Sequence, residues 1–222
     1  MKYFSCIFGL VTKHDPTTEN GGLFFAHYLV LKKALGLKIT AEDFIIFTTK
    51  MLKAKTSDGL YKRSEHHTVR TVSHDEISGM LISSNILKTQ HTEEIMLKLE
   101  SGFGNYPATG VNKFYNPADF YAWATLAKRW YAPLFAPFYV LNLLITSNKK
   151  KQDTSGKLIY MDELFLMKDL SLFSKLLHKY FVWRMKKMYG QFWVKELFSI
   201  YFSTEDADFP LLELSQQIQG DI

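Results

Sequence analysis

The sequence predicts an all-α protein, folded as a single compact multi-helix domain. Apolar residues recur at helical spacing along most of the 222 residues, several helix starts carry recognisable caps, and strand signals are scarce. Hydrophobic residues make up 47% of the chain, which is enough to bury a core. We expect the helical domain to cover residues 1–202, with a candidate internal break at 101–115, and residues 203–222 to form a C-terminal tail.

The first helices follow from cap chemistry. The N-terminal segment before them is apolar, and we expect a short strand or helical turn there rather than a signal peptide, because no small-residue cleavage pattern follows. Asp15-Pro16 is a favourable start for a helix over 17–35, which the following glycine ends. Thr40-Ala-Glu-Asp43 resembles a capping box and predicts a second helix.

The most informative stretch runs from Asp58 to Leu87, and it opens with a turn followed by a polar strip. Ser73-His-Asp-Glu76 then matches the capping box S-x-x-E, in which the serine hydroxyl accepts one backbone N–H and the glutamate reaches back to another. We therefore expect a helix to begin here. Gly79 lies inside that helix, where glycine costs about 1 kcal/mol relative to alanine but permits close contact with another helix.

The second half of the chain continues with helices. A short amphipathic helix is expected over 92–100, and residues 101–110 form the longest loop rich in glycine and proline. Asn116-Pro117 repeats the cap-then-proline start and predicts another helix. Two further amphipathic helices are expected over 161–189 and 191–202, separated by a glycine.

Residues 130–147, WYAPLFAPFYVLNLLITS, form an uncharged run of 18 residues. This length is at the lower limit for a membrane span. Pro133, Pro137 and Asn142 argue against a span, so we expect a buried central helix, with a membrane-associated helix as the alternative. We do not expect the protein to act at a membrane.

Charge and cysteine content narrow the classes of function. The net charge is +5, but the basic residues are spread along the chain without a nucleic-acid-binding motif, so we interpret them as solvated faces. Cys6 is the single cysteine, which excludes an intramolecular disulfide and a cysteine-based metal site and fits a reducing compartment. The 18 Phe and 12 Tyr fit a packed core and an assembly surface equally well.

Histidine and acidic residues gather in one short stretch: His66, His67, His74, Asp75 and Glu76. Imidazole and carboxylate groups are the usual ligands of zinc, manganese and iron. Two ligands on one helix face need a spacing of three or four residues, which this stretch lacks. We interpret it as a helix cap and a solvated loop, expect no cofactor, and leave metal binding open.

A small hydrolase, metal-assisted or not, is the alternative function. It would use His74 and Asp75 at the helix start, Asp58 in the turn, and Arg63 to bind an anion beside them. One carboxyl group would act as general acid and another would activate water. No G-x-S-x-G elbow, P-loop or G-x-G-x-x-G motif accompanies these residues, so we favour a function other than catalysis.

Two further patterns are interpreted as structural. His27 and His178 lie in apolar helical stripes, and we expect them to be core or interface histidines with satisfied hydrogen bonds. The aromatic residues between Tyr115 and Tyr139 would suit a stacking platform for sugars or single-stranded DNA. At helical spacing, however, such residues usually form core, which is our expectation here.

The run DGLYKR from Asp58, the run RTVSHDEISGMLIS from Arg70, and FYNPADFY ending at Tyr121 together resemble a pattern found in uncharacterised proteins of tailed bacteriophages. The resemblance covers under a third of the chain and implies a phage setting, in the virion or the host cytoplasm, without carrying over any catalytic residue. Together with the missing catalytic motifs and the aromatic excess, the resemblance leads us to expect a structural or interaction protein. We expect it to be associated with the virion and to contact other phage subunits or form a homo-oligomer.

Overall fold

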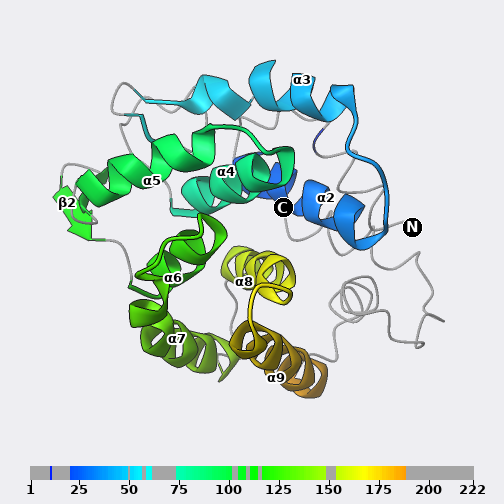
Figure 1. Ribbon diagram of the computed structural model, residues 1–222, viewed down its shortest axis with the longest axis vertical. Coiled ribbons are helices and arrows are strands. Elements are labelled where there is room, and N and C mark those ends of the chain that lie inside the picture. Colours follow the sequence, from blue (N-terminus) through cyan, green and yellow to red (C-terminus); the bar gives the residue numbers. More distant parts are fainter. Residues whose placement is uncertain are drawn as a thin grey trace.

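The computed structural model describes residues 11, 21–49, 51–56, 59–61, 74–101, 105–108, 111–114, 117–148 and 154–188. Over these residues the protein is all-α, as predicted, with one small hairpin (Figure 1). The α-helices are α2 (Gly21–Ala34), α3 (Ala41–Thr49), α4 (His74–Leu87), α5 (His91–Ser101), α6 (Pro117–Leu126), α7 (Ala136–Asn148), α8 (Thr154–Met167) and α9 (Leu172–Met188).

Helices α4 and α8 organise the core. α4 packs against α2, α5, α6 and α8, and α8 in turn packs against α2, α6 and α9. In Figure 1, α6, α7 and α9 lie around α8, and α2 and α4 lie on its other side. The core between them contains large, fully buried side chains, among them Phe25, Phe47, Trp123 and Tyr139.

Helices α2 and α4 approach each other closely at two glycines. A Cβ atom added to Gly79 would lie 2.5 Å from the backbone C and O of Gly22, far inside van der Waals contact. A Cβ on Gly22 would overlap the carboxylate of Glu76. The prediction that Gly79 permits close contact with another helix is therefore confirmed, and the partner is α2.

The helix predicted to begin at Ser73–Glu76 is also confirmed, because α4 begins at His74. Ser73 lies outside the described residues, so both halves of the capping box remain a prediction. The Glu76 side chain is buried, and its Oε2 accepts the backbone N–H of Gly22 at 2.8 Å. Glu76 thus joins α4 to α2, a role that the local motif does not reveal.

The acidic half of the capping box predicted at Thr40–Asp43 is present at the start of α3. Asp43 Oδ2 accepts the backbone N–H of Thr40 at 2.6 Å. The same oxygen lies 2.6 Å from the ammonium group of Lys32, and both side chains are buried. The acid therefore caps α3 and ties it to the end of α2. The residues of the predicted Asp15-Pro16 start lie outside the described ones.

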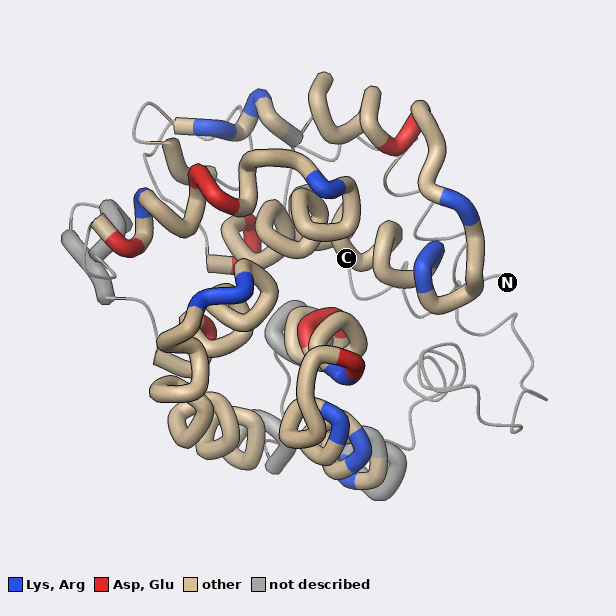
Figure 2. Tube along the Cα trace, in the orientation of Figure 1, with Lys and Arg blue, Asp and Glu red and all other residues tan. Residues whose placement is uncertain are grey.

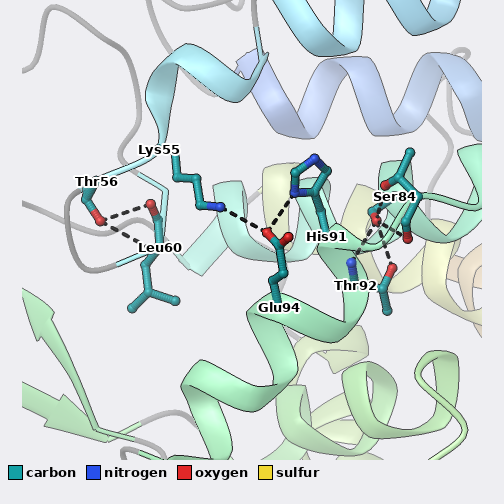
Figure 3. Close-up of polar contacts among 8 residues, drawn as sticks. Lys55, Thr56, Leu60, Ser84, His91, Thr92 and Glu94 are labelled. Carbon is teal, nitrogen blue, oxygen red and sulfur yellow. Dashed lines mark hydrogen bonds and ion pairs between the residues drawn. The ribbon is translucent and has the colours of Figure 1, made fainter.

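The corner between α4 and α5 is built from hydroxyl groups (Figure 3). Ser84 on α4 accepts the backbone N–H of Thr92 at 2.8 Å and the Thr92 hydroxyl at 2.9 Å. Beside it, Glu94 Oε2 lies 2.9 Å from His91 Nδ1 and 3.0 Å from the ammonium group of Lys55. Ser84, eight positions before Thr92, thus caps the start of α5. Helix α5 begins at His91, one residue before the predicted start.

The loop predicted at 101–110 contains one strand, which pairs with a second strand just after it. β1 (Asn105–Ala108) and β2 (Val111–Phe114) form an antiparallel hairpin in which Asn105 pairs with Phe114. Each strand is only four residues long, so neither produces a clear alternating pattern. The strand considered for the N-terminal segment lies outside the described residues, and the internal break at 101–115 remains a prediction. The predicted proline start is confirmed, since α6 begins at Pro117.

The prediction of a single helix over 161–189 is wrong. The segment belongs to two helices, because α8 ends at Met167 and α9 begins at Leu172. The Ser171 hydroxyl accepts the backbone N–H of Ser174 at 3.0 Å and so caps α9. The turn between the helices contains no glycine or proline, so the apolar spacing hid it. The predicted helix at 191–202 and the tail at 203–222 lie outside the described residues.

The prediction of one buried central helix over 130–147 is wrong, because the segment is divided and partly exposed. The segment forms a short 3-10 helix, η2 (Ala132–Phe135), followed by α7. Tyr139 and Leu143 are buried, but the opposite face of α7 is exposed. Among the described helices, none combines the length and the apolar character that crossing a membrane requires.

Candidate functional site

The candidate site is a group of titratable side chains between α2, α4, α6 and α8, which we call the buried network. Its members come from separate helices that only the fold brings together. They are His27 on α2, His74 on α4, Asp119 on α6, and Asp162 and Glu163 on α8.

His74 is the member nearest to solvent, with about a third of its side chain exposed. Its Nε2 lies 2.8 Å from Asp119 Oδ2, and its Nδ1 lies 3.2 Å from Asp75 Oδ1. The indole ring of Trp123 packs against the imidazole, with ring centroids 5.6 Å apart. Burial alone would lower the pKa of His74, but hydrogen bonds and attraction from Asp119 and Asp75 outweigh it and raise the pKa to about 10.

The two acids of α8, Asp162 and Glu163, are fully buried. His27 Nδ1 lies 2.9 Å from Asp162 Oδ1 and 3.2 Å from Oδ2, which fastens α2 to α8. The hydroxyl of Tyr139 donates to Glu163 Oε2 at 3.3 Å and brings α7 into contact with the network. Burial and the nearby charge of Asp119 raise the pKa of Glu163 well above its usual range, although His74 opposes this.

Trp123 also links α6 to α4 through a polar contact. Its indole N–H donates to the hydroxyl of Ser78 at 2.9 Å, and both side chains are buried. A buried indole N–H generally needs such a partner. The ring is thereby held against His74, so the position of the histidine is fixed by packing as well as by its two aspartates.

These protonation states limit the chemistry of the buried network. A general base must accept a proton near neutral pH, whereas the pKa of His74 near 10 keeps its imidazole charged there. The pKa of Glu163 is raised well above its usual range, but the side chain has almost no contact with solvent, so a substrate in solution cannot reach it. Among the described residues, no group of three or more His, Cys, Asp or Glu side chains is placed to hold a metal ion. The geometry fits a charge-paired structural network better than a reaction centre.

Of the predicted site residues, His74 and Asp75 lie together. The contacts of His74 with Asp119 and Trp123 were not predicted. Asp58 and Arg63 lie outside the described residues, as do His66 and His67, so the hydrolase grouping stays a prediction.

Sequence reasoning missed Asp119, Asp162 and Glu163. The only local signal was an acidic pair inside the apolar run of α8, which is unusual in a helix whose described residues 159–167 are buried. The interpretation of His27 as a satisfied core histidine is confirmed by its contact with Asp162. His178 is buried too, and this burial together with the charge of Lys168 lowers its pKa to about 4.

The aromatic group predicted to be core is divided. Tyr121, Trp123 and Tyr139 are buried as expected. Trp130 and Phe138 are largely exposed, which corrects the core assignment for these two rings. Aromatic residues therefore contribute both to the core and to the surface of this half of the protein.

Comparisons with family models, curated proteins and solved structures give no match for this chain.

Proposed function

We propose that the protein is a structural or interaction protein of a tailed bacteriophage, acting through protein–protein contacts, and that α7 binds a second copy of the chain. The observation that carries the proposal is an exposed apolar line that begins in η2 and continues along α7. We call it the α7 stripe, and it consists of Leu134, Phe138, Leu141 and Ile145.

The spacing of the α7 stripe is that of a helix–helix seam. Its residues follow one another at intervals of four, three and four positions, the pattern that one helix presents to another in a coiled coil. Between 46% and 67% of each side chain is exposed, although all four are large and apolar. Contiguous exposed apolar surface on a soluble protein commonly marks a contact with another protein.

The absence of charge on α7 favours self-association. The described part of α7 carries no acidic or basic residue, as Figure 2 shows along its length. A charged margin would select a partner of opposite charge, whereas an uncharged stripe is complementary to itself. Two copies related by a two-fold axis would bury the same four side chains on both sides. The phage setting is supported only by the resemblance between Asp58 and Tyr121.

Light scattering over a range of protein concentrations tests the self-association. We expect a dimer for the natural sequence and a monomer for Leu141→Glu, which places a charge in the middle of the stripe. Ile45→Glu is the matched control, because Ile45 is equally exposed but lies on α3. A natural protein that stays monomeric at every concentration, or a Leu141→Glu variant that still dimerises, would refute the role of α7. Mass spectrometry of purified phage particles tests the setting separately.

The hydrolase is the second candidate, favoured by one observation, the contact of His74 with both Asp75 and Asp119. The charge on His74 and the burial of Glu163 oppose it, as described above. The decisive measurement is hydrolysis of a panel of ester, phosphoester and glycoside substrates by the natural protein and by His74→Gln. Turnover that disappears in the variant would replace the interaction proposal with the enzymatic one.

A further inference from the structure

A second exposed face lies on α9 and differs in chemistry from the α7 stripe. Four of its residues follow the same spacing of four, three and four positions: Leu172, Leu176, Lys179 and Trp183. All four are exposed, and so are Phe173 and Lys175 beside them. We call these six residues the α9 ridge. The opposite side of the helix, which includes Leu177 and Phe181, is buried against the protein.

The α9 ridge is basic as well as apolar. The helix Leu172–Met188 carries five lysine and arginine residues and no aspartate or glutamate. Figure 2 shows basic residues along the described part of α9, in contrast to the described part of α7, which has none. Within the described residues, neither Lys175 nor Lys179 forms an ion pair. An occupant of this face therefore needs both apolar side chains and negative charge.

One segment of the chain has this composition. Residues 203–222 contain five aspartate and glutamate residues and no lysine or arginine. Leu211, Leu214, Ile218 and Ile222 recur at helical spacing, and Pro210 comes just before the first of them, a favoured position at a helix start. The segment lies outside the described residues, so its pattern is known from sequence alone. That pattern predicts an acidic helix with one apolar line.

The length of chain between the two segments permits them to meet. α9 ends at Met188, so 14 residues separate it from residue 203. Such a connection spans up to about 48 Å when fully extended. A helix of 17 residues is about 25 Å long, so the connection can return along the whole of α9. Attachment to the same chain also gives the segment a high effective concentration at the ridge.

We propose that residues 203–222 bind to the α9 ridge of their own chain. The apolar line of the segment packs on Leu172, Leu176 and Trp183, and its acids lie beside Lys175 and Lys179. Apolar burial supplies most of the affinity, while the charges select this segment and orient it. The interaction weakens at high salt, because exposed ion pairs are screened. The proposal is independent of the α7 stripe and stands whether or not the protein dimerises.

Hydrogen exchange of the full chain, read by mass spectrometry, tests this binding. We expect backbone amides of residues 209–219 to exchange at least about tenfold more slowly than an unstructured peptide. The variant Lys175→Glu/Lys179→Glu should reduce this protection, because two attractive charges become repulsive. Helix α4 should keep its own protection, which shows that the fold is intact. Lys33→Glu/Lys38→Glu is the control, because it makes the same change of charge at exposed lysines near the end of α2.

Several outcomes would overturn the proposal. If residues 209–219 exchange as fast as an unstructured peptide in the natural protein, the segment is not bound. If residues 209–219 are equally protected in the ridge variant and in the control variant, the segment binds at a site other than the α9 ridge. Protection that rises with protein concentration assigns the segment to the ridge of a second copy. A ridge that becomes protected only on vesicles containing phosphatidylglycerol is a membrane-binding surface instead.

Discussion

The close contact between α2 and α4 makes Gly79→Ala the sharpest test of the fold. The added Cβ would lie 2.5 Å from the C and O atoms of Gly22 and 2.6 Å from the backbone N of Leu23. Non-bonded carbon atoms prefer separations of about 3.5–4.0 Å, so the methyl group is about 1 Å too close. All three contacts are backbone atoms, which cannot rotate away as a side chain can.

The expected loss of stability follows from two opposing effects. Overpacking a tight contact typically costs about 1–3 kcal/mol, and a rigid backbone partner favours the upper end of that range. Replacing a helical glycine by alanine returns about 1 kcal/mol of helix propensity. We therefore expect Gly79→Ala to lower the free energy of unfolding by about 2 kcal/mol, measured by urea denaturation followed by circular dichroism.

Hydrogen exchange separates this cause from a general loss of stability. Gly79→Ala should speed local exchange in both α2 and α4, because the two helices must move apart. Gly36→Ala is the control: its Cβ would meet nothing within 4 Å, but its φ of 68° strains any other residue. It should destabilise the protein without loosening the contact between the helices. A Gly79→Ala protein that is as stable as the natural one would refute the close crossing.

The remaining predictions concern the pH dependence of the buried network. Despite burial, Asp119 and Asp75 raise the pKa of His74 to about 10, so its stabilisation is complete below pH 6.5 and is lost as the pH rises towards 10. His74→Gln should therefore destabilise the protein at pH 6 and have little effect at pH 10, as measured by denaturation at both values; an equal effect at both would show that His74 is not held as a cation. Burial and Asp119 raise the pKa of Glu163, so the stability it contributes falls as the pH rises above its ordinary value of 4.5. Glu163→Gln should gain stability relative to the natural protein between pH 5 and pH 8, and a constant difference over that interval would contradict the burial of an ionisable carboxyl group.

The sequence predicted what local chemistry determines. Caps and prolines placed the starts of α3, α4 and α6, because the hydrogen bonds that begin a helix involve residues only a few positions apart. The buried network escaped prediction for the opposite reason. His27 and Asp162 are 135 positions apart, and no local pattern indicates which acid a buried histidine will meet.

Exposure was predicted poorly in the uncharged segments. The uncharged segment 130–147 has apolar residues on both faces of α7, so periodicity alone could not say which face is buried. The fold decides this by placing α7 at the side of α6 and α9, which covers Tyr139 and Leu143 and leaves the α7 stripe outside. The candidate interaction surface therefore became visible only with the structure.

Several titratable side chains are buried in this protein, while several leucines are exposed. The buried side chains influence where the exposed leucines lie. Fully buried polar pairs such as His27 and Asp162 contribute little net stability compared with apolar side chains of the same size, because removing polar groups from water is costly. Their geometric requirement is strict, however, so they fix the register of α8 against α2. α9 packs on α8, and α7 packs on α9. The position of both exposed faces therefore depends on the register of α8, which the buried polar pairs hold in place.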